Sequence, residues 1–126
     1  MSLCFQVAAV KKPLVAVVRI CEKGNKVCLG PDEKDNYIQN VSSGSKIYMR
    51  KQRGSFVVDG QFGDGNWVET TVDSAAEESV CPKEWGRQFG TTQVEENKKL
   101  NFVSASGGKI EHYDERKVVL NTKSTF

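Results

Sequence analysis

The stretch that decides the fold reads Trp67-Val68-Glu69-Thr70-Thr71-Val72-Asp73-Ser74-Ala75-Ala76-Glu77-Glu78-Ser79-Val80. Its first half is rich in β-branched residues, which favour a β-strand. The strand is expected to end at Asp73, so that a carboxylate lies at the strand end with three small residues after it. Small neighbours let backbone N–H groups approach and hydrogen-bond a carboxylate. A second interpretation stays open, because Ser74 with Glu77 three residues later is also the pattern of a helix capping box.

Short strand-like stretches recur along the chain, separated by residues that favour turns. Alternation or β-branched content predicts further strands over 3–9, 37–39, 46–49, 55–58, 100–103 and 117–120. A helix is expected over 13–21, with Pro13 near its first turn and Gly24 as its stop, and a helical turn or two over 82–89. Many short strands with glycine turns and one or two short helices predict a mainly β fold, built as a small closed-barrel-like structure or a sandwich.

The composition is that of a small globular domain with few options for chemistry. The chain has 126 residues, 38% hydrophobic and 27% charged, which predicts one domain over 1–126. No apolar run approaches the roughly 20 residues of a membrane span, and the first residues lack a signal-peptide pattern. Four cysteines without C-x-x-C spacing and a single histidine, His112, argue against a zinc site or a histidine-based triad. We therefore expect an intracellular, cytoplasmic protein with reduced, buried cysteines and no metal or cofactor, in which carboxylate chemistry remains open.

Charge is divided unevenly between the two halves of the chain. Residues 1–63 carry ten Lys and Arg against five Asp and Glu, whereas 64–126 carry eight against eleven. The change coincides with the glycine-rich segment 60–66, which has the composition of a loop. Each half is short for a core of its own, so we expect two lobes, 1–62 and 67–126, of one domain. The formal net charge of +2 is too small to predict nucleic-acid binding.

Three stretches of the chain carry a resemblance to a known family. Val72-Asp73-Ser74-Ala75-Ala76 is similar to a D-S/T-G-A motif that follows an apolar strand, and Ala105-Ser106-Gly107-Gly108-Lys109-Ile110 is similar to a glycine-bearing flap hairpin. Residues 12–27 resemble an N-L-L-S-V stretch that follows such a flap, and the expected strands over 37–58 resemble the hairpin after it. Together these stretches resemble the retropepsin-like aspartic proteases of copia-type retrotransposon polyproteins.

The order of these stretches differs from the order in that family. There the D-S/T-G-A strand comes first, followed by the flap and then the helix, whereas here the helix precedes the aspartate. Reading from Trp67 to Phe126 and continuing at Met1 restores the family order. The resemblance therefore implies a circular permutation in which 60–66 joins the former ends. Domain termini often lie close together at the surface, where permutation is tolerated.

The resemblance implies an aspartic endopeptidase that needs two copies of the chain. One chain offers one catalytic carboxylate, Asp73, so the Asp–Asp dyad has to form across the two-fold axis of a homodimer. The two carboxylates share a proton, and the ionised one activates a water molecule while the protonated one polarises the scissile carbonyl of an extended peptide or polyprotein. Ser74 and Ala75 would support the dyad. The flap residues that would cover the substrate are Ala105, Ser106, Gly107, Gly108 and Ile110.

Ala75 departs from the family motif, whose third residue is glycine. Its Cβ is expected to crowd the dyad, or to strain the backbone if the site needs a positive φ, and so to weaken catalysis. A non-catalytic peptide-binding or dimerisation domain of the same fold is the alternative that Ala75 favours. A nucleic-acid-associated module that uses the basic first half is a third alternative.

Other polar and aromatic residues have simpler interpretations. Asp64 lies between two glycines and is expected in a turn. His112 is expected as a surface or packing residue, and Trp67 and Trp85 as core or interface aromatics. Solvated faces are expected at 77–78, 95–96 and 50–53.

Overall fold

The chain folds mainly into β-strands, as its sequence predicts, in the computed structural model that describes residues 1–104, 106–122 and 124–125. The main sheet contains β1 (Ser2–Ala8), β2 (Leu14–Ala16), β6 (Arg50–Gln52), β7 (Ser55–Gln61), β8 (Trp67–Asp73), β9 (Val80–Cys81), β10 (Thr92–Gln93), β13 (His112–Val119) and β14 (Asn121–Thr122). A second sheet contains β3 (Asn25–Cys28), β4 (Tyr37–Asn40), β5 (Lys46–Tyr48) and β15 (Ser124–Thr125). A separate hairpin pairs β11 (Phe102–Val103) with β12 (Lys109–Ile110).

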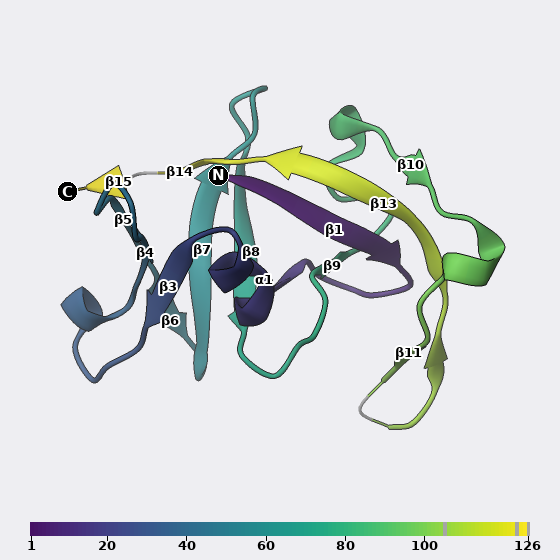
Figure 1. Cartoon of the computed structure of the whole chain (residues 1–126), viewed down its shortest axis with the longest axis horizontal. Helices are drawn as coiled ribbons and strands as arrows, with labels where there is room; N and C mark the ends of the chain where they lie inside the picture. Colours follow the sequence, from purple (N-terminus) through teal and green to yellow (C-terminus); the bar gives the residue numbers. More distant parts are fainter. Residues whose placement is uncertain (105, 123, 126) are drawn as a thin grey trace.

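The main sheet is open, which corrects the expectation of a closed-barrel-like fold. Its strand order is β10-β13-β1-β9-β2-β8-β7-β14, with β6 beside β7, and no pairing among the described strands returns from β14 to β10. The two long antiparallel pairs, β1–β13 and β7–β8, run in different directions (Figure 1) and are connected through the short strands β9 and β2. A barrel needs continuous, staggered pairing around its whole circumference, and this arrangement of strands does not supply it.

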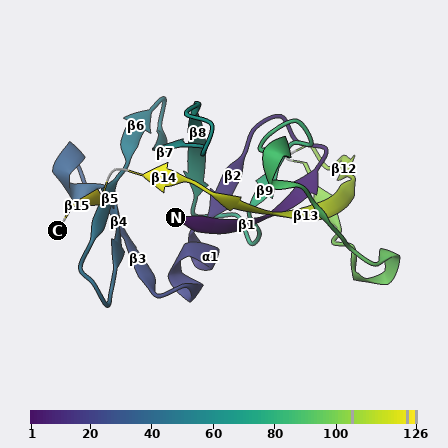
Figure 2. The same ribbon diagram turned by 90° about the horizontal axis from the view of Figure 1, so that it is seen from above.

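The three β units lie along the length of the molecule. Seen from above, the four-stranded sheet lies at one end, the β7–β8 pair near the middle, and the β1–β13 pair leads toward the β11–β12 hairpin at the other end (Figure 2). None of the helices in the described part of the chain has the length and apolar character needed to cross a membrane.

Both halves of the sequence contribute to one hydrophobic cluster. Trp85, from the second half, packs edge-on against two rings of the first half, with centroid distances of 4.9 Å to Phe5 and 5.2 Å to Phe62. Phe62 belongs to the expected joining segment 60–66, yet it is buried, and β7 continues to Gln61. The connection between β7 and β8 is therefore a shorter turn, in which Asp64 accepts the N–H of Asn66 at 3.0 Å, as expected for a turn aspartate.

The helix expected over 13–21 is shorter than its sequence predicts and begins later. Residues 14–16 form β2, which pairs in parallel with β8, and α1 covers only Val17–Glu22. The β-branched Val15 suits a strand, and β8 offers its backbone a partner that lies far away in the sequence. Gly24 follows α1 with a φ of +86° and ends the helical stretch, as predicted.

The remaining expectations for helices and strands hold with shifted ends. The helical turn over 82–89 is reduced to the 3-10 helix η2 (Arg87–Phe89), and two others are η1 (Glu33–Asp35) and η3 (Glu96–Lys98). The strand over 117–120 is the end of the longer β13, and the strand over 100–103 shrinks to β11. Cys81 is buried as expected, but Cys21 is exposed and the other two cysteines are intermediate.

Candidate functional site

Asp73 lies at the carboxyl end of β8, where the sequence places a carboxylate. β8 is held on one side by antiparallel β7 and on the other by parallel β2, with Ala16 as the register partner of Asp73. The side chain is half-buried, and its Oδ1 accepts the N–H of Ala75 at 2.9 Å. This is the one hydrogen bond of the Asp73 carboxylate within the described part of the chain. A carboxylate has four lone-pair directions, so most of its accepting capacity is free.

The segment after Asp73 is not a helix, which excludes the capping box as its explanation. Residues 74–79 form bends between β8 and β9. Arg19 of α1 holds this segment, because its Nε donates to the Glu77 carbonyl at 3.1 Å and its Nη2 pairs with the Glu78 carboxylate. The Glu78 side chain is only 25% exposed, so the solvated face expected at 77–78 is wrong for this residue. Hydrogen bonds with Glu22 and Glu78 raise the pKa of the Arg19 guanidinium.

Ser79 is a second anchor of this segment that the sequence did not single out. Its buried hydroxyl accepts the N–H of Ala16 at 3.0 Å, and its carbonyl accepts the N–H of Gln6 at 2.8 Å. Arg19 and Ser79 therefore tie the end of the segment, residues 77–79, to α1, β2 and β1. The available signal for them was weak, since one arginine and one serine carry no motif by themselves.

Ser74 and Ala75 follow Asp73 on the surface. Both residues are exposed, and Ala75 uses its N–H to bond the Asp73 carboxylate. Among the described non-glycine residues only Arg53 has a positive φ. Alanine in place of the motif's glycine therefore does not strain the backbone at residue 75. Crowding of its Cβ against a second chain stays a prediction.

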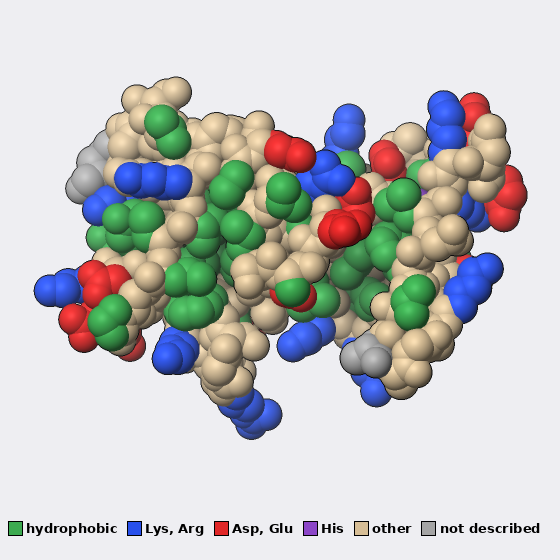
Figure 3. Space-filling view, turned by 60° about the horizontal axis from the view of Figure 1, so that its bottom comes forward, with side chains coloured by type: hydrophobic (Ala, Val, Ile, Leu, Met, Phe, Trp, Pro, Cys, Tyr) green, Lys and Arg blue, Asp and Glu red, His purple; other side chains and the backbone are tan. Residues whose placement is uncertain are grey.

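Two grooves adjoin this segment. One, of about 440 Å³, is lined by Asp73 and Ser74 together with the apolar side chains of Val17, Leu29 and Phe56. The other, of about 470 Å³, lies between the 76–80 segment and the β11–β12 hairpin, and its lining is mostly apolar: Val10, Leu14, Ala76, Val80, Leu100, Phe102, Val103 and Ile110 are among its residues. Leu14 lines both grooves. In the space-filling view apolar side chains gather on this face of the molecule (Figure 3).

The expected flap residues lie in the hairpin, but they do not all reach a groove. Ser106, Gly107 and Gly108 belong to the described part of its tip, where Ser104 donates its N–H to the Gly108 carbonyl at 2.8 Å. Gly107 has a φ of +88°, a conformation that glycine adopts without strain. Ser106 bonds Ser104 through their hydroxyls at 3.0 Å. Ile110 alone of the described set lines a groove, and Ala105 lies outside the described residues.

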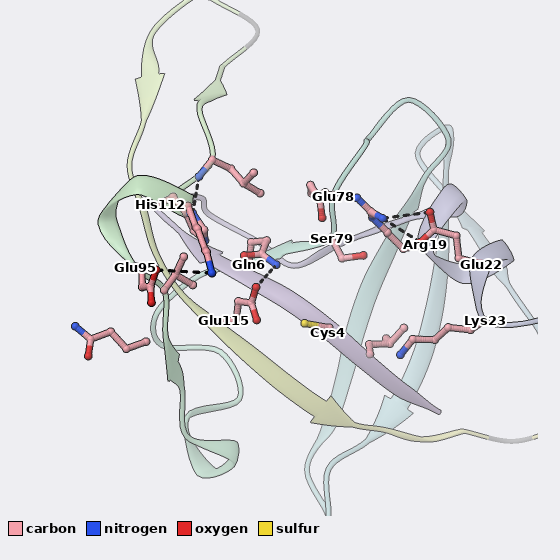
Figure 4. A pocket seen from close by; sticks show the side chains of 15 residues that line it. Cys4, Gln6, Arg19, Glu22, Lys23, Glu78, Ser79, Glu95, His112 and Glu115 are labelled. Atoms are coloured by element: carbon pink, nitrogen blue, oxygen red, sulfur yellow. Dashed lines mark hydrogen bonds and ion pairs between the residues drawn. The ribbon is translucent and has the colours of Figure 1, made fainter.

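A further cavity, about 610 Å³, does not include Asp73. It lies over β1 and β13, with Arg19, Glu22 and Glu78 on one side and Glu95 and His112 on the other (Figure 4). Most of its charged side chains are already paired, for example Arg19 with Glu22 at 2.9 Å. No group of three or more His, Cys, Asp or Glu side chains in the described ranges is arranged to hold a metal ion.

Comparisons with protein-family models, with curated proteins and with solved structures find no match for this chain.

Proposed function

We propose that this protein is a homodimeric aspartic endopeptidase of the retropepsin-like class, in which Asp73 is the catalytic carboxylate. The observation that carries the proposal is the environment of Asp73: a half-buried carboxylate at a strand end, with one hydrogen bond and a groove beside it. Buried carboxylates that serve only the fold are hydrogen-bonded within it. Asp73 keeps lone pairs available for a water molecule or a second carboxyl group.

The chemistry requires a second Asp73 from another copy of the chain. When two carboxyl groups meet closely, one remains protonated because two like charges cannot both be desolvated together. The ionised group then takes a proton from water as the water attacks the peptide carbonyl, and the protonated group hydrogen-bonds the carbonyl oxygen. Ser74 is next to Asp73 and exposed, and in the proposed dimer it would contact the partner copy. The apolar Leu29 and Val17 beside Asp73 offer surface that such a partner would cover.

The apolar groove suits the side chains of an extended peptide. Ile110 and Phe102 of the hairpin form one wall, and Ala76 and Val80 of the segment after Asp73 form the other. An extended substrate would expose alternate side chains to this groove and its backbone to the hairpin, which is a β-augmentation mode of binding. The groove therefore supports peptide as the substrate class.

The contact between the start of the chain and β13 supports the permuted order. The ammonium group of Met1 donates to the Leu120 carbonyl at 2.7 Å, and the Leu120 N–H donates to the Met1 carbonyl at 2.8 Å. β1 then pairs antiparallel with β13 along its whole length. In the family order β13 precedes β1, so this antiparallel pair would join two strands that follow one another with 121–126 between them.

The test is cleavage of a denatured protein mixture between mildly acidic and neutral pH, with and without pepstatin. We expect pepstatin-sensitive cleavage that falls roughly a thousandfold or more in Asp73→Asn. Asp59→Asn is the matched control, since Asp59 is an exposed carboxylate on β7 that pairs with Arg50. Cleavage that survives Asp73→Asn, or a strictly monomeric protein with full activity in sedimentation, would contradict the proposal.

A peptide-binding or dimerisation domain without catalysis is the second candidate, and Ala75 is the observation that favours it. If the Ala75 Cβ crowds a partner carboxylate, Ala75→Gly should increase cleavage. An unchanged rate in Ala75→Gly would remove crowding as a reason for low activity. Dimerisation and peptide binding without any cleavage in either form would favour the second candidate.

A further inference from the structure

The base of the β11–β12 hairpin is closed by a side chain. His112, the first residue of β13, is 4% exposed, and its Nδ1 accepts the N–H of Leu100 at 3.0 Å (Figure 4). The imidazole also packs edge-on against Phe102, with a centroid distance of 5.5 Å. His112 thus contacts Leu100 and Phe102, on the β11 side of the hairpin, although it belongs to β13, the strand that follows β12.

The register shows what the imidazole replaces. Phe102 faces Ile110 in the hairpin, and two positions nearer the tip Ser104 donates to the Gly108 carbonyl. Two positions in the other direction Leu100 faces His112, and a continued antiparallel ladder would send the Leu100 N–H to the backbone carbonyl of His112. The backbone of His112 is instead paired with Ala8 of β1. The imidazole Nδ1 takes the place of that carbonyl and connects the hairpin to the main sheet.

This bond needs the neutral imidazole. Nδ1 can accept only with a free lone pair, so the proton of the neutral ring is assigned to Nε2. Nε2 is buried and has no hydrogen-bond partner among the described residues. In the imidazolium both nitrogens are donors, so the Leu100 N–H would face another N–H. Protonation therefore removes the bond and adds a buried charge.

Charged and polar groups from several elements share a cavity with the imidazole. Glu95 precedes the 3-10 helix η3 and Lys98 is its last residue. Both line the same cavity as His112, and so does Glu115 of β13. β1 contributes Gln6, which donates to Glu115 at 3.4 Å, and the thiol of Cys4. The side of the cavity away from His112 is lined by Arg19, Lys23, Glu22 and Glu78. Glu95 pairs with Lys98 at 3.7 Å, so the negative and positive charges of these two side chains partly cancel near the imidazole.

We propose that His112 is a positioning residue that clamps the base of the β11–β12 hairpin in its neutral form and releases it when the imidazole is protonated. The clamp sets how freely the groove wall formed by Phe102 and Ile110 moves relative to Val80. Its effect on peptide cleavage rests on the proposed function, whereas the clamp itself does not.

The experiment is NMR of the whole chain, labelled with nitrogen-15 and without any peptide. The chain has a single histidine, so all imidazole signals belong to residue 112. We expect the Nε2–H tautomer at pH 7.5, and a Leu100 amide resonance that shifts with the same midpoint as the imidazole. Amide exchange at Leu100 and Phe102, corrected for intrinsic exchange, should be about fivefold faster once the imidazole is protonated, the effect of losing one hydrogen bond.

Two variants separate the clamp from simple packing. His112→Asn keeps an acceptor near the Nδ1 position and cannot titrate, so it should preserve slow exchange and abolish the pH dependence. His112→Leu keeps an apolar side chain without an acceptor, and should show fast exchange at both pH values. An Nδ1–H tautomer, or a Leu100 amide resonance that does not shift when the imidazole is protonated, would overturn the clamp even if His112→Leu fails to fold. Neither result bears on cleavage by Asp73, which the Asp73→Asn assay decides separately.

Discussion

Arg116 on β13 and Asp73 at the end of β8 are charged residues of one sheet with three strands between them, and their hydrogen bonding differs. Arg116 of β13 is 5% exposed and donates to three backbone carbonyls, those of Gly90 at 3.0 Å, Lys83 at 3.1 Å and Trp85. Asp73 is half-buried and accepts one hydrogen bond.

The difference separates a charge that is satisfied within the fold from one whose proposed role is catalytic. A buried charge is tolerated when its hydrogen-bonding groups are satisfied, and Arg116 organises the 83–90 segment over the core in this way. Asp73 leaves its capacity unused at a surface groove. The comparison therefore predicts that changes around Arg116 affect folding, and that changes at Asp73 affect chemistry alone.

The largest effect is expected in the reactivity of Cys81, which lies beside Arg116. Burial raises the pKa of the Cys81 thiol from 9.0 to about 11, although Arg116 acts in the opposite direction. At pH 8 the thiolate is then about a hundredfold rarer than in an unburied thiol. Iodoacetamide followed by mass spectrometry should label the exposed Cys21 first and Cys81 last. Because the pKa is higher in the folded state, this group also makes stability decline as pH rises from about 9 toward about 11. Early labelling of Cys81 in folded protein would contradict this description of the core.

The next largest effect is expected for Arg116→Met. The substitution keeps much of the side-chain volume but leaves three carbonyls without their donor, so the free energy of unfolding should fall by about 3 kcal/mol. Urea denaturation measures this change. Arg50→Met is the matched control, because Arg50 forms ion pairs with Asp59 and Glu69 at the exposed surface and should change stability far less. If both variants lost the same free energy of unfolding, the buried arginine would contribute no more to stability than the exposed one.

A smaller loss is expected for Ser79→Ala. Removing the hydroxyl leaves the buried N–H of Ala16 without an acceptor, which should cost about 1–2 kcal/mol in urea denaturation. Ser79→Thr retains the hydroxyl and should recover part of this loss. A neutral Ser79→Ala would mean that Arg19 and the backbone bond from Gln6 to Ser79 hold the segment after Asp73 without the hydroxyl.

The smallest effect on stability is expected for Asp73→Asn. The amide oxygen can still accept the N–H of Ala75, so the free energy of unfolding should change by less than about 0.5 kcal/mol. The same denaturation experiment checks this, and it is also the folding control for the cleavage assay. A loss as large as that of Arg116→Met would assign Asp73 to the fold instead of to chemistry.

Much of the local structure around the candidate site could be predicted because it follows from local composition. The β-branched run before Asp73 forms β8, and the glycines at 44 and 54 form turns between strands with φ of +77° and +80°. Residues 14–16 could not be assigned in the same way. Their apolar sequence suits a helix or a buried strand, and only pairing with β8, more than fifty residues away, selects the strand.

The sequence by itself determined a mainly β chain, the glycine-rich tip of the 102–110 hairpin and a carboxylate at the end of β8. Only the tertiary structure decided that the sheet stays open, that Arg19 reaches Glu78 and that the His112 imidazole meets the Leu100 N–H. The physical reason is distance along the chain. Turn and strand preferences act between neighbouring residues. Each of these contacts instead joins separate segments, and their approach depends on how the whole sheet pairs and packs.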